Sequence, residues 1–171
     1  MALEHWGRAV LSVAEVQQII MRPKSLASSM VWSMRIGKLT FAWLATRMAL
    51  QFDDEELVRE SFYVQCQWRK RGNTIPEHWT FNLIYNGNRI YALHFQPTSI
   101  HENLVGKGRP FFGQEIDGIH EHTWSDDGDG YAEPISLPEG RPDIMWKMFS
   151  KRTNTSSSEF FHPDENKPEL I

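Results

Sequence analysis

The pair Asn86-Gly87, set between two apolar segments, constrains the fold of this chain more than any other feature. Both residues tolerate the positive φ angles of a type I′ turn, so the dipeptide predicts a two-residue β-hairpin. Its strands run from Trp79 to Tyr85 and from Asn88 to Phe95. A turn of this length also fixes the register. In that register Tyr85 lies opposite Asn88, Leu83 opposite Ile90, Phe81 opposite Ala92, and Trp79 opposite His94.

Apolar side chains occur on both faces of this predicted hairpin. One face carries Trp79, Phe81, Leu83, Tyr85, Ile90 and His94, and the other carries Ile84, Tyr91, Leu93 and Phe95 among polar residues. Strands that are apolar on both faces are buried on both faces. We therefore expect the hairpin to lie at the centre of a sheet.

Further strands are predicted on either side of this hairpin. Residues Phe62 to Lys70 alternate between apolar and polar side chains, which is typical of a half-buried strand. The segments Val31 to Ile36 and Leu39 to Leu50 flank Gly37-Lys38 and predict a second hairpin, although residues 42–50 also fit a helix. Shorter strands are expected at Ile119 to Trp124 and at Tyr131 to Ile135.

Two helices are predicted, one near each end of the chain. Ser12 and Glu15 form a capping-box pattern, in which the serine caps the helix and the glutamate bonds back to it. This pattern begins a helix over Val13 to Met21, which Pro23 ends. A second helix begins at Pro142-Asp143 and extends to about Arg152.

Together these elements predict an α+β fold. We expect an antiparallel sheet of five or six strands, with the N-terminal and the C-terminal helix packed on it. Residues 1–152 form a single domain, and residues 153–171, rich in Ser, Pro and acidic side chains, form a flexible tail. A long loop from Gln96 to Gly118 interrupts the sheet, and loops of that length are often functional.

Composition excludes several classes of protein. The net charge of −4 provides no global basic field for nucleic acid. The single cysteine, Cys66, excludes an internal disulfide and a cysteine zinc site. The N-terminus lacks a signal-peptide pattern, and Leu39 to Leu50 is too short to span a membrane. We expect a soluble, cytoplasmic protein with no membrane partner.

Four of the seven histidines fall in one region of the sequence, and they are the main candidates for chemistry. His120 and His122 are two residues apart in a predicted strand, so their rings point the same way. Such a pair can bind one zinc-like ion, which needs a third ligand from His94, His101 or Asp117. No cofactor is required by the sequence, and a divalent metal is an open alternative.

The same histidines also fit metal-free acid–base chemistry. Two imidazoles in one cleft can act as base and acid. With a cation for phosphate, this arrangement suits RNA cleavage, where the 2′-hydroxyl is the nucleophile. The phosphate-binding candidates are Arg89, Lys107 and Arg109, and Tyr131 is a further substrate-binding candidate. The plain alternative is that both histidines are solvated or hydrogen-bonded strand residues.

Four short motifs occur in the middle third of the chain: residues 81–90 (FNLIYNGNRI), His101-x-Asn103, Gly118-x-His120-x-His122 and residues 130–134 (GYAEP). With these motifs the chain resembles a family of small uncharacterised proteins of bacteria and phages. This resemblance implies a mobile-element or defence-related context and a shared cluster of His101, Asn103, His120 and His122. It implies no known reaction.

The leading functional hypothesis is a small nuclease-like protein, a toxin type that acts on RNA. His120 and His122 are its predicted acid–base pair, and His101 and Asn103 orient the substrate. The rival hypothesis is a non-catalytic, phage-encoded inhibitor that binds a host defence complex such as a CRISPR-type assembly. RNA or a host or phage protein complex is accordingly the expected partner. A third hypothesis is a histidine-metal hydrolase.

Overall fold

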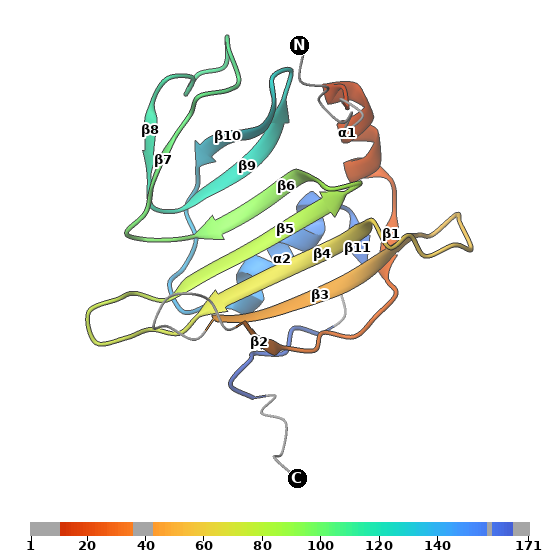
Figure 1. Cartoon of the computed structure of the whole chain (residues 1–171), viewed down its shortest axis with the longest axis horizontal. Coiled ribbons are helices and arrows are strands. Elements are labelled where there is room, and N and C mark those ends of the chain that lie inside the picture. Colours follow the sequence, from red (N-terminus) through yellow and green to blue (C-terminus); the bar gives the residue numbers. More distant parts are fainter. Residues whose placement is uncertain (1–10, 36–42, 157–158, 166–171) are drawn as a thin grey trace, which may run out of the picture.

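The computed structural model describes residues 11–35, 43–156 and 159–165 (Figure 1). These residues form two helices, α1 (Val13–Met21) and α2 (Pro142–Arg152). The first six strands are β1 (Lys24–Leu26), β2 (Ser33–Arg35), β3 (Trp43–Phe52), β4 (Phe62–Arg69), β5 (His78–Tyr85) and β6 (Asn88–Phe95). The remaining strands are β7 (Ile100–Glu102), β8 (Glu115–Asp117), β9 (His120–Ser125), β10 (Gly128–Pro134) and β11 (Thr155–Ser156).

The architecture is mostly sheet, and the expected α+β fold with five or six strands is wrong. Nine strands form one curled sheet in the order β10-β9-β6-β5-β4-β3-β1-β11, with β2 also paired to β3. Two strands of this sheet that were not predicted, β1 and β11, have only three and two residues, too few to show a periodic pattern. The strand predicted at Val31 to Ile36 is present as β2, which pairs antiparallel with β3. The sheet curls into a half-barrel, and the two helices are short: α2 lies against one face of the sheet, and α1 lies beside one end of its strands (Figure 1).

Both predicted helices are confirmed at the expected residues. In α1 the Ser12 hydroxyl accepts from the Glu15 backbone N–H at 3.2 Å, and the Glu15 carboxylate accepts from the Ser12 backbone N–H at 2.7 Å. These two bonds satisfy helix N–H groups that would otherwise lack partners. Pro142 begins α2, where its missing N–H costs nothing.

The core lies between one face of the sheet and α2. In β4 the predicted alternation is confirmed, because Phe62, Val64, Cys66 and Trp68 are buried while the intervening residues are half-buried. Trp146 and Phe149 of α2 pack into the same cluster. Each such buried side chain contributes about 1.5–3 kcal/mol. The sheet therefore has one apolar face against α2 and one polar face.

The Asn86-Gly87 turn is confirmed, but the predicted register beyond it is wrong. Tyr85 pairs with Asn88 as expected, and a β-bulge then follows between Leu83 and Ile84. The bulge leaves Ile90 as the extra residue, so Leu83 pairs with Tyr91 and Thr80 pairs with His94. A shift of one residue moves every later side chain to the other face. His94 thus lies on the face opposite Trp79, the polar one.

The long loop before β9 contains a small second sheet. β7 and β8 pair antiparallel, and the segment between them folds back against β10. Asn103 fixes it: its Nδ2 donates to the Phe111 and Ala132 carbonyls at 3.0 and 2.8 Å, and its Oδ1 accepts from the Ala132 N–H at 2.7 Å.

The segment after α2 packs onto the rest of the chain where the structure describes it. β11 pairs parallel with β1, and Phe160 packs against the core cluster. Lys24, fully buried, donates its ammonium group to the Ile20 carbonyl at 2.9 Å and to the Thr153 carbonyl. Burial lowers the pKa of Lys24 to about 8. The domain boundary at residue 152 stays a prediction, but residues 153–156 and 159–165 contact the sheet directly.

Neither of the two described helices has the length and apolar character needed to cross a membrane.

Candidate metal centre

Three histidines converge on one point of the polar face. One ring nitrogen from each of His94, His120 and His122 lies within 4.8 Å of the others, and all three residues are buried. The ring centroids are 4.6 to 5.1 Å apart. This is the spatial cluster that the sequence could only suggest.

Strand pairing explains why the three rings meet. His94 in β6 lies directly opposite His120 in β9, and His122 follows two residues along the same strand. Side chains two residues apart in a strand share a face. The bulge in the β5–β6 hairpin is also required, because the regular register would have turned His94 toward the α2 core.

Neighbouring carbonyl groups determine the tautomer of two rings. The Nδ1 of His120 donates to the Gly118 carbonyl at 2.8 Å, and the Nε2 of His94 donates to the Asn82 side-chain carbonyl at 3.3 Å. A carbonyl oxygen only accepts, so the other nitrogen of each ring keeps its lone pair. Hydrogen bonds of this kind, from the ring nitrogen that does not bind the metal, orient metal-ligating histidines in proteins.

His122 has a different environment. Its Nε2 lies 3.1 Å from the Nε2 of His120, while its Nδ1 is buried and has no hydrogen-bond partner among the described groups. Two nitrogens on one tetrahedral zinc ion lie about 3.3 Å apart, given Zn–N bonds of 2.0–2.1 Å. The Nε2–Nε2 spacing therefore fits two ligands of one cation.

Burial keeps all three rings neutral. Desolvation is the largest cause that lowers the pKa of His94, His120 and His122, and the Arg89 guanidinium adds a smaller repulsion to each. Neutral imidazole is the form that binds a metal ion. The cluster is thus a set of bases at neutral pH.

His101 joins the cluster as a fourth ring. It is half-buried, and its centroid lies 4.7 Å from that of His122 and 5.4 Å from that of His120. Its Nε2 donates to the Gly130 carbonyl at 2.7 Å, which leaves Nδ1 with the lone pair. The ring therefore offers a proton acceptor beside the three-histidine group.

No family model matches this chain, and no curated protein or solved structure is detectably similar to it. The resemblance to small bacterial and phage proteins stays a prediction.

Two other predicted site residues lie away from the three rings. Asp117 is exposed on β8, outside the group whose atoms converge on one point. Asn103 is fully buried, and both hydrogens of its amide are used by backbone carbonyls. The geometry gives Asn103 a structural role, because it joins the loop to β10 beside the cluster.

Most of the predicted substrate-binding residues have partners, and two of them, Arg109 and Tyr131, lie on the opposite face of the sheet from the histidine rings. Arg89 pairs with Asp129 at 3.1 Å, and Arg109 pairs with Glu133 at 2.8 Å. Tyr131 is buried beneath the Arg109 guanidinium, and its hydroxyl accepts from the Phe111 N–H. Lys107 is exposed in the loop. The two arginines thus carry compensated charges.

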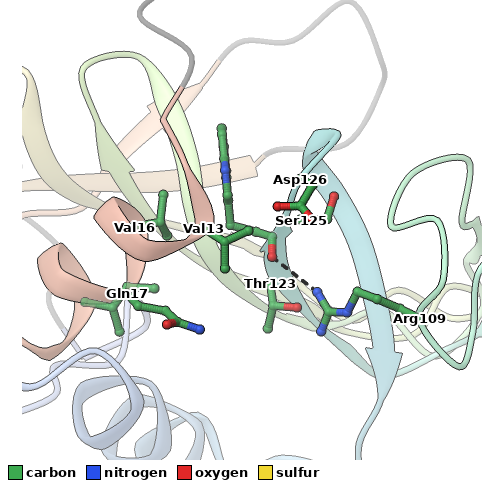
Figure 2. Close-up of a pocket in the computed structure, with 9 residues that line it drawn as sticks. Val13, Val16, Gln17, Arg109, Thr123, Ser125 and Asp126 are labelled. Carbon is green, nitrogen blue, oxygen red and sulfur yellow. Dashed lines mark hydrogen bonds between the residues drawn. The ribbon is translucent and has the colours of Figure 1, made fainter.

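A separate cavity of about 380 Å³ lies between α1 and β9, and Figure 2 shows the residues that line it. Val13 and Val16 of α1 form part of its wall, and Thr123 and Asp126 lie opposite them. Arg109 closes one side and donates to the Trp124 carbonyl at 3.2 Å. The Thr123 hydroxyl is buried without a hydrogen-bond partner among the described groups.

Sequence inspection missed Asn82 and the carbonyls of Gly118 and Gly130, which orient the rings. Asn82 occurs in a strand, where asparagine is uncommon, and that was the available signal. Every residue has a backbone carbonyl, so the sequence does not indicate which carbonyls bond to the rings.

Proposed function

We propose that this chain is a metal-dependent hydrolase whose ion is held by His94, His120 and His122. The observation behind this proposal is the convergence of three buried ring nitrogens within 4.8 Å. Three imidazoles with one open position form a known type of catalytic zinc site. A zinc ion so held lowers the pKa of a bound water to about 7 and thereby supplies hydroxide at neutral pH.

The metal-free alternative is less well supported. Cleavage by an acid–base histidine pair requires one imidazolium to protonate the leaving group. Burial lowers the pKa of His94, His120 and His122, and repulsion among the rings lowers it further. Each ring is then a base at neutral pH, and the pair His120–His122 lacks an acid.

In the proposed site the surrounding residues orient the ligands and accept a proton. Asn82 and the Gly118 carbonyl fix the rings of His94 and His120. The ring of His101, whose centroid lies 4.7 Å from that of His122, would act as a proton acceptor beside an ion held by the three histidines. The Asn103 amide ties the segment that follows His101 to β10, the strand paired with β9.

The test is zinc content and affinity of the full chain. We expect one zinc per chain by elemental analysis after dialysis against a weak chelator. The double variant His120→Ala/His122→Ala should lose at least 100-fold in zinc affinity, because removal of even an outer-shell partner costs about 10–100-fold. A chromophoric zinc chelator in competition measures the affinity.

His101→Ala is the matched control, since it removes a ring from the same cluster that is outside the three-ligand group. It should retain zinc while losing most hydrolysis of a labelled RNA. Substoichiometric zinc in the wild type, or equal zinc affinity in the double variant, would overturn the proposal. Stoichiometric zinc without any hydrolysis would favour the non-catalytic binding protein instead.

A further inference from the structure

The arginines of this protein divide into two classes by their partners. Most described arginine side chains have a carboxylate within 4.0 Å. These are Arg22, Arg59, Arg71, Arg89, Arg109, Arg141 and Arg152. Arg47 and Arg69 have no such partner among the described residues. These two guanidinium groups therefore carry charges that no carboxylate among the described residues neutralises within 4.0 Å.

Both uncompensated arginines stack on aromatic rings. The Arg47 guanidinium lies 3.7 Å from the Tyr63 ring centroid, and that of Arg69 lies 5.3 Å from the centroid of Trp43. Their polar contacts are with neutral groups. Arg47 donates to the Glu60 carbonyl at 2.6 Å, and Arg69 contacts His78, a ring that burial and Arg69 itself keep neutral. The Nε of Arg69 has no hydrogen-bond partner among the described groups.

The two stacked pairs lie on the same face of the sheet as the metal centre. Arg47 and Arg69 project from the polar face of β3 and β4, opposite the face that packs on α2. Figure 1 views the sheet from this side, with α2 behind it. Gln67, between them in register, neighbours Thr80, which neighbours His94. At 4.7–4.9 Å per strand, Gln67 is therefore about 10 Å from His94.

We propose that the polar face of β3, β4 and β5 binds single-stranded nucleic acid and leads its backbone to the histidine centre. This inference rests on the proposed function, because it names the substrate class of that site. Arg47 and Arg69 contact phosphates, and the stacked pairs Arg47–Tyr63 and Arg69–Trp43 support bases.

The spacing of the two cations favours a polymer over a small anion. Arg47 pairs with Gln65, four residues from Arg69 along β4, so the two are about 13 Å apart at 3.3 Å per residue. One phosphate cannot contact both, whereas a chain of phosphodiesters can. The aromatic planes favour nucleic acid over an acidic peptide, because bases stack on aromatic and guanidinium planes. Bases are available for stacking only in a single strand.

The test uses fluorescence anisotropy of a short, labelled oligouridylate with the full chain in EDTA and low salt. Chelation removes cleavage, so the measurement reports binding alone. We expect saturable binding that weakens with salt. Arg47→Gln/Arg69→Gln should reduce affinity about tenfold or more, and the salt slope should fall by about 1.4 for two lost phosphate contacts on a single strand.

Arg71→Gln/Arg141→Gln is the matched control, since both of these exposed arginines already pair with a carboxylate. It should bind as the wild type does. Arg47→Glu, a change at an exposed side chain, should also weaken binding and guards against misfolding of the Arg69 variant. His120→Ala/His122→Ala should lose zinc and keep RNA binding, which separates this inference from the proposed function.

Three results would overturn the inference. The first is absence of binding by the folded wild type in low salt. The second is equal affinity of the Arg47→Gln/Arg69→Gln variant and its control. The third is competition by polyglutamate at the same charge concentration as RNA, which would indicate an acidic-peptide surface instead.

Discussion

At the scale of single residues, the histidine cluster combines burial with neutrality. Each ring of the three-ligand group belongs to a residue that is at most 8% exposed, yet no carboxylate among the described residues shares the cluster to stabilise an imidazolium. The adjacent Glu121 points to the other face, where it accepts from the Tyr91 hydroxyl at 2.7 Å. A proton added to this cluster is therefore energetically costly in the folded state.

This cost predicts acid sensitivity of the metal-free protein. The folded-state pKa of each ring is below the ordinary value of 6.5, so the unfolded chain binds more protons below that pH. The free energy of unfolding is therefore unaffected by these rings above pH 6.5, and it decreases as the pH falls below that value. At pH 5 each ring lowers the free energy of unfolding by up to about 2 kcal/mol relative to pH 6.5, at 1.36 kcal/mol per pH unit. Urea denaturation in EDTA at pH 7 and pH 5 measures the loss.

His122→Gln is the comparison variant, because glutamine does not titrate. Its free energy of unfolding should fall less between pH 7 and pH 5 than that of the wild type, by about 1–2 kcal/mol. An identical fall in both proteins would show that this ring does not contribute to acid sensitivity.

Residue types near the site could be predicted, but their convergence could not. The pattern His120-x-His122 correctly indicated two rings on one face. Whether His94 meets them depends on the pairing of β6 with β9 and on a bulge. Both are relations between segments distant in sequence, and single-strand periodicity contains no information on them.

At the scale of elements, the loop between β7 and β8 is held by close contacts with β10. Gly106 packs against the Tyr131 ring at a positive φ of 84°. A Cβ at this position would lie 2.3 Å from a ring carbon, which is impossible without movement. The loop and the ring stacked under Arg109 thus depend on a glycine.

Gly106→Ala should destabilise the fold by about 2 kcal/mol or more, since the clash adds to the backbone strain of a left-handed residue. Gly108→Ala is a matched control, because Gly108 has nearly the same φ of 86° but has no atom within 4 Å of the point that a Cβ would occupy. Thermal unfolding of both variants separates the clash from the strain. Equal losses in the two proteins would contradict the close packing.

Elements with strong local patterns were predicted well. The capping box set the start of α1, and alternation set β4. The number of strands was underestimated in part because β1 and β11 gain their hydrogen bonds only from β3 or from each other. Such short strands form where a neighbour offers a free edge, and their own sequence does not specify them.

At the scale of the whole molecule, the segment after α2 completes the core. The Phe160 ring packs near Trp79, Phe81 and Trp146, with centroids 5.8 to 6.5 Å away. The Trp32 indole donates to the Phe161 carbonyl at 2.8 Å. The two adjacent phenylalanines differ, since the Phe161 side chain is 40% exposed.

Phe160→Ala should therefore lower stability by about 2 kcal/mol, somewhat less than for a fully buried phenylalanine. Phe161→Ala should change it by less than about 0.5 kcal/mol, because the mutation keeps the backbone carbonyl that Trp32 uses. Chemical denaturation of the two variants beside the wild type measures the difference. Equal stability of both variants would mean that the segment does not support the core.

The parallel pairing of β1 with β11 has a consequence for biosynthesis. Lys24 pairs with Thr155, which lies 131 residues later in the sequence. During translation the ribosome still holds the later strand when the earlier one has emerged. The outer edge of β1 therefore stays unpaired until β11 has been synthesised, and nascent chains expose a pairing surface that chaperones or other copies of the chain can capture.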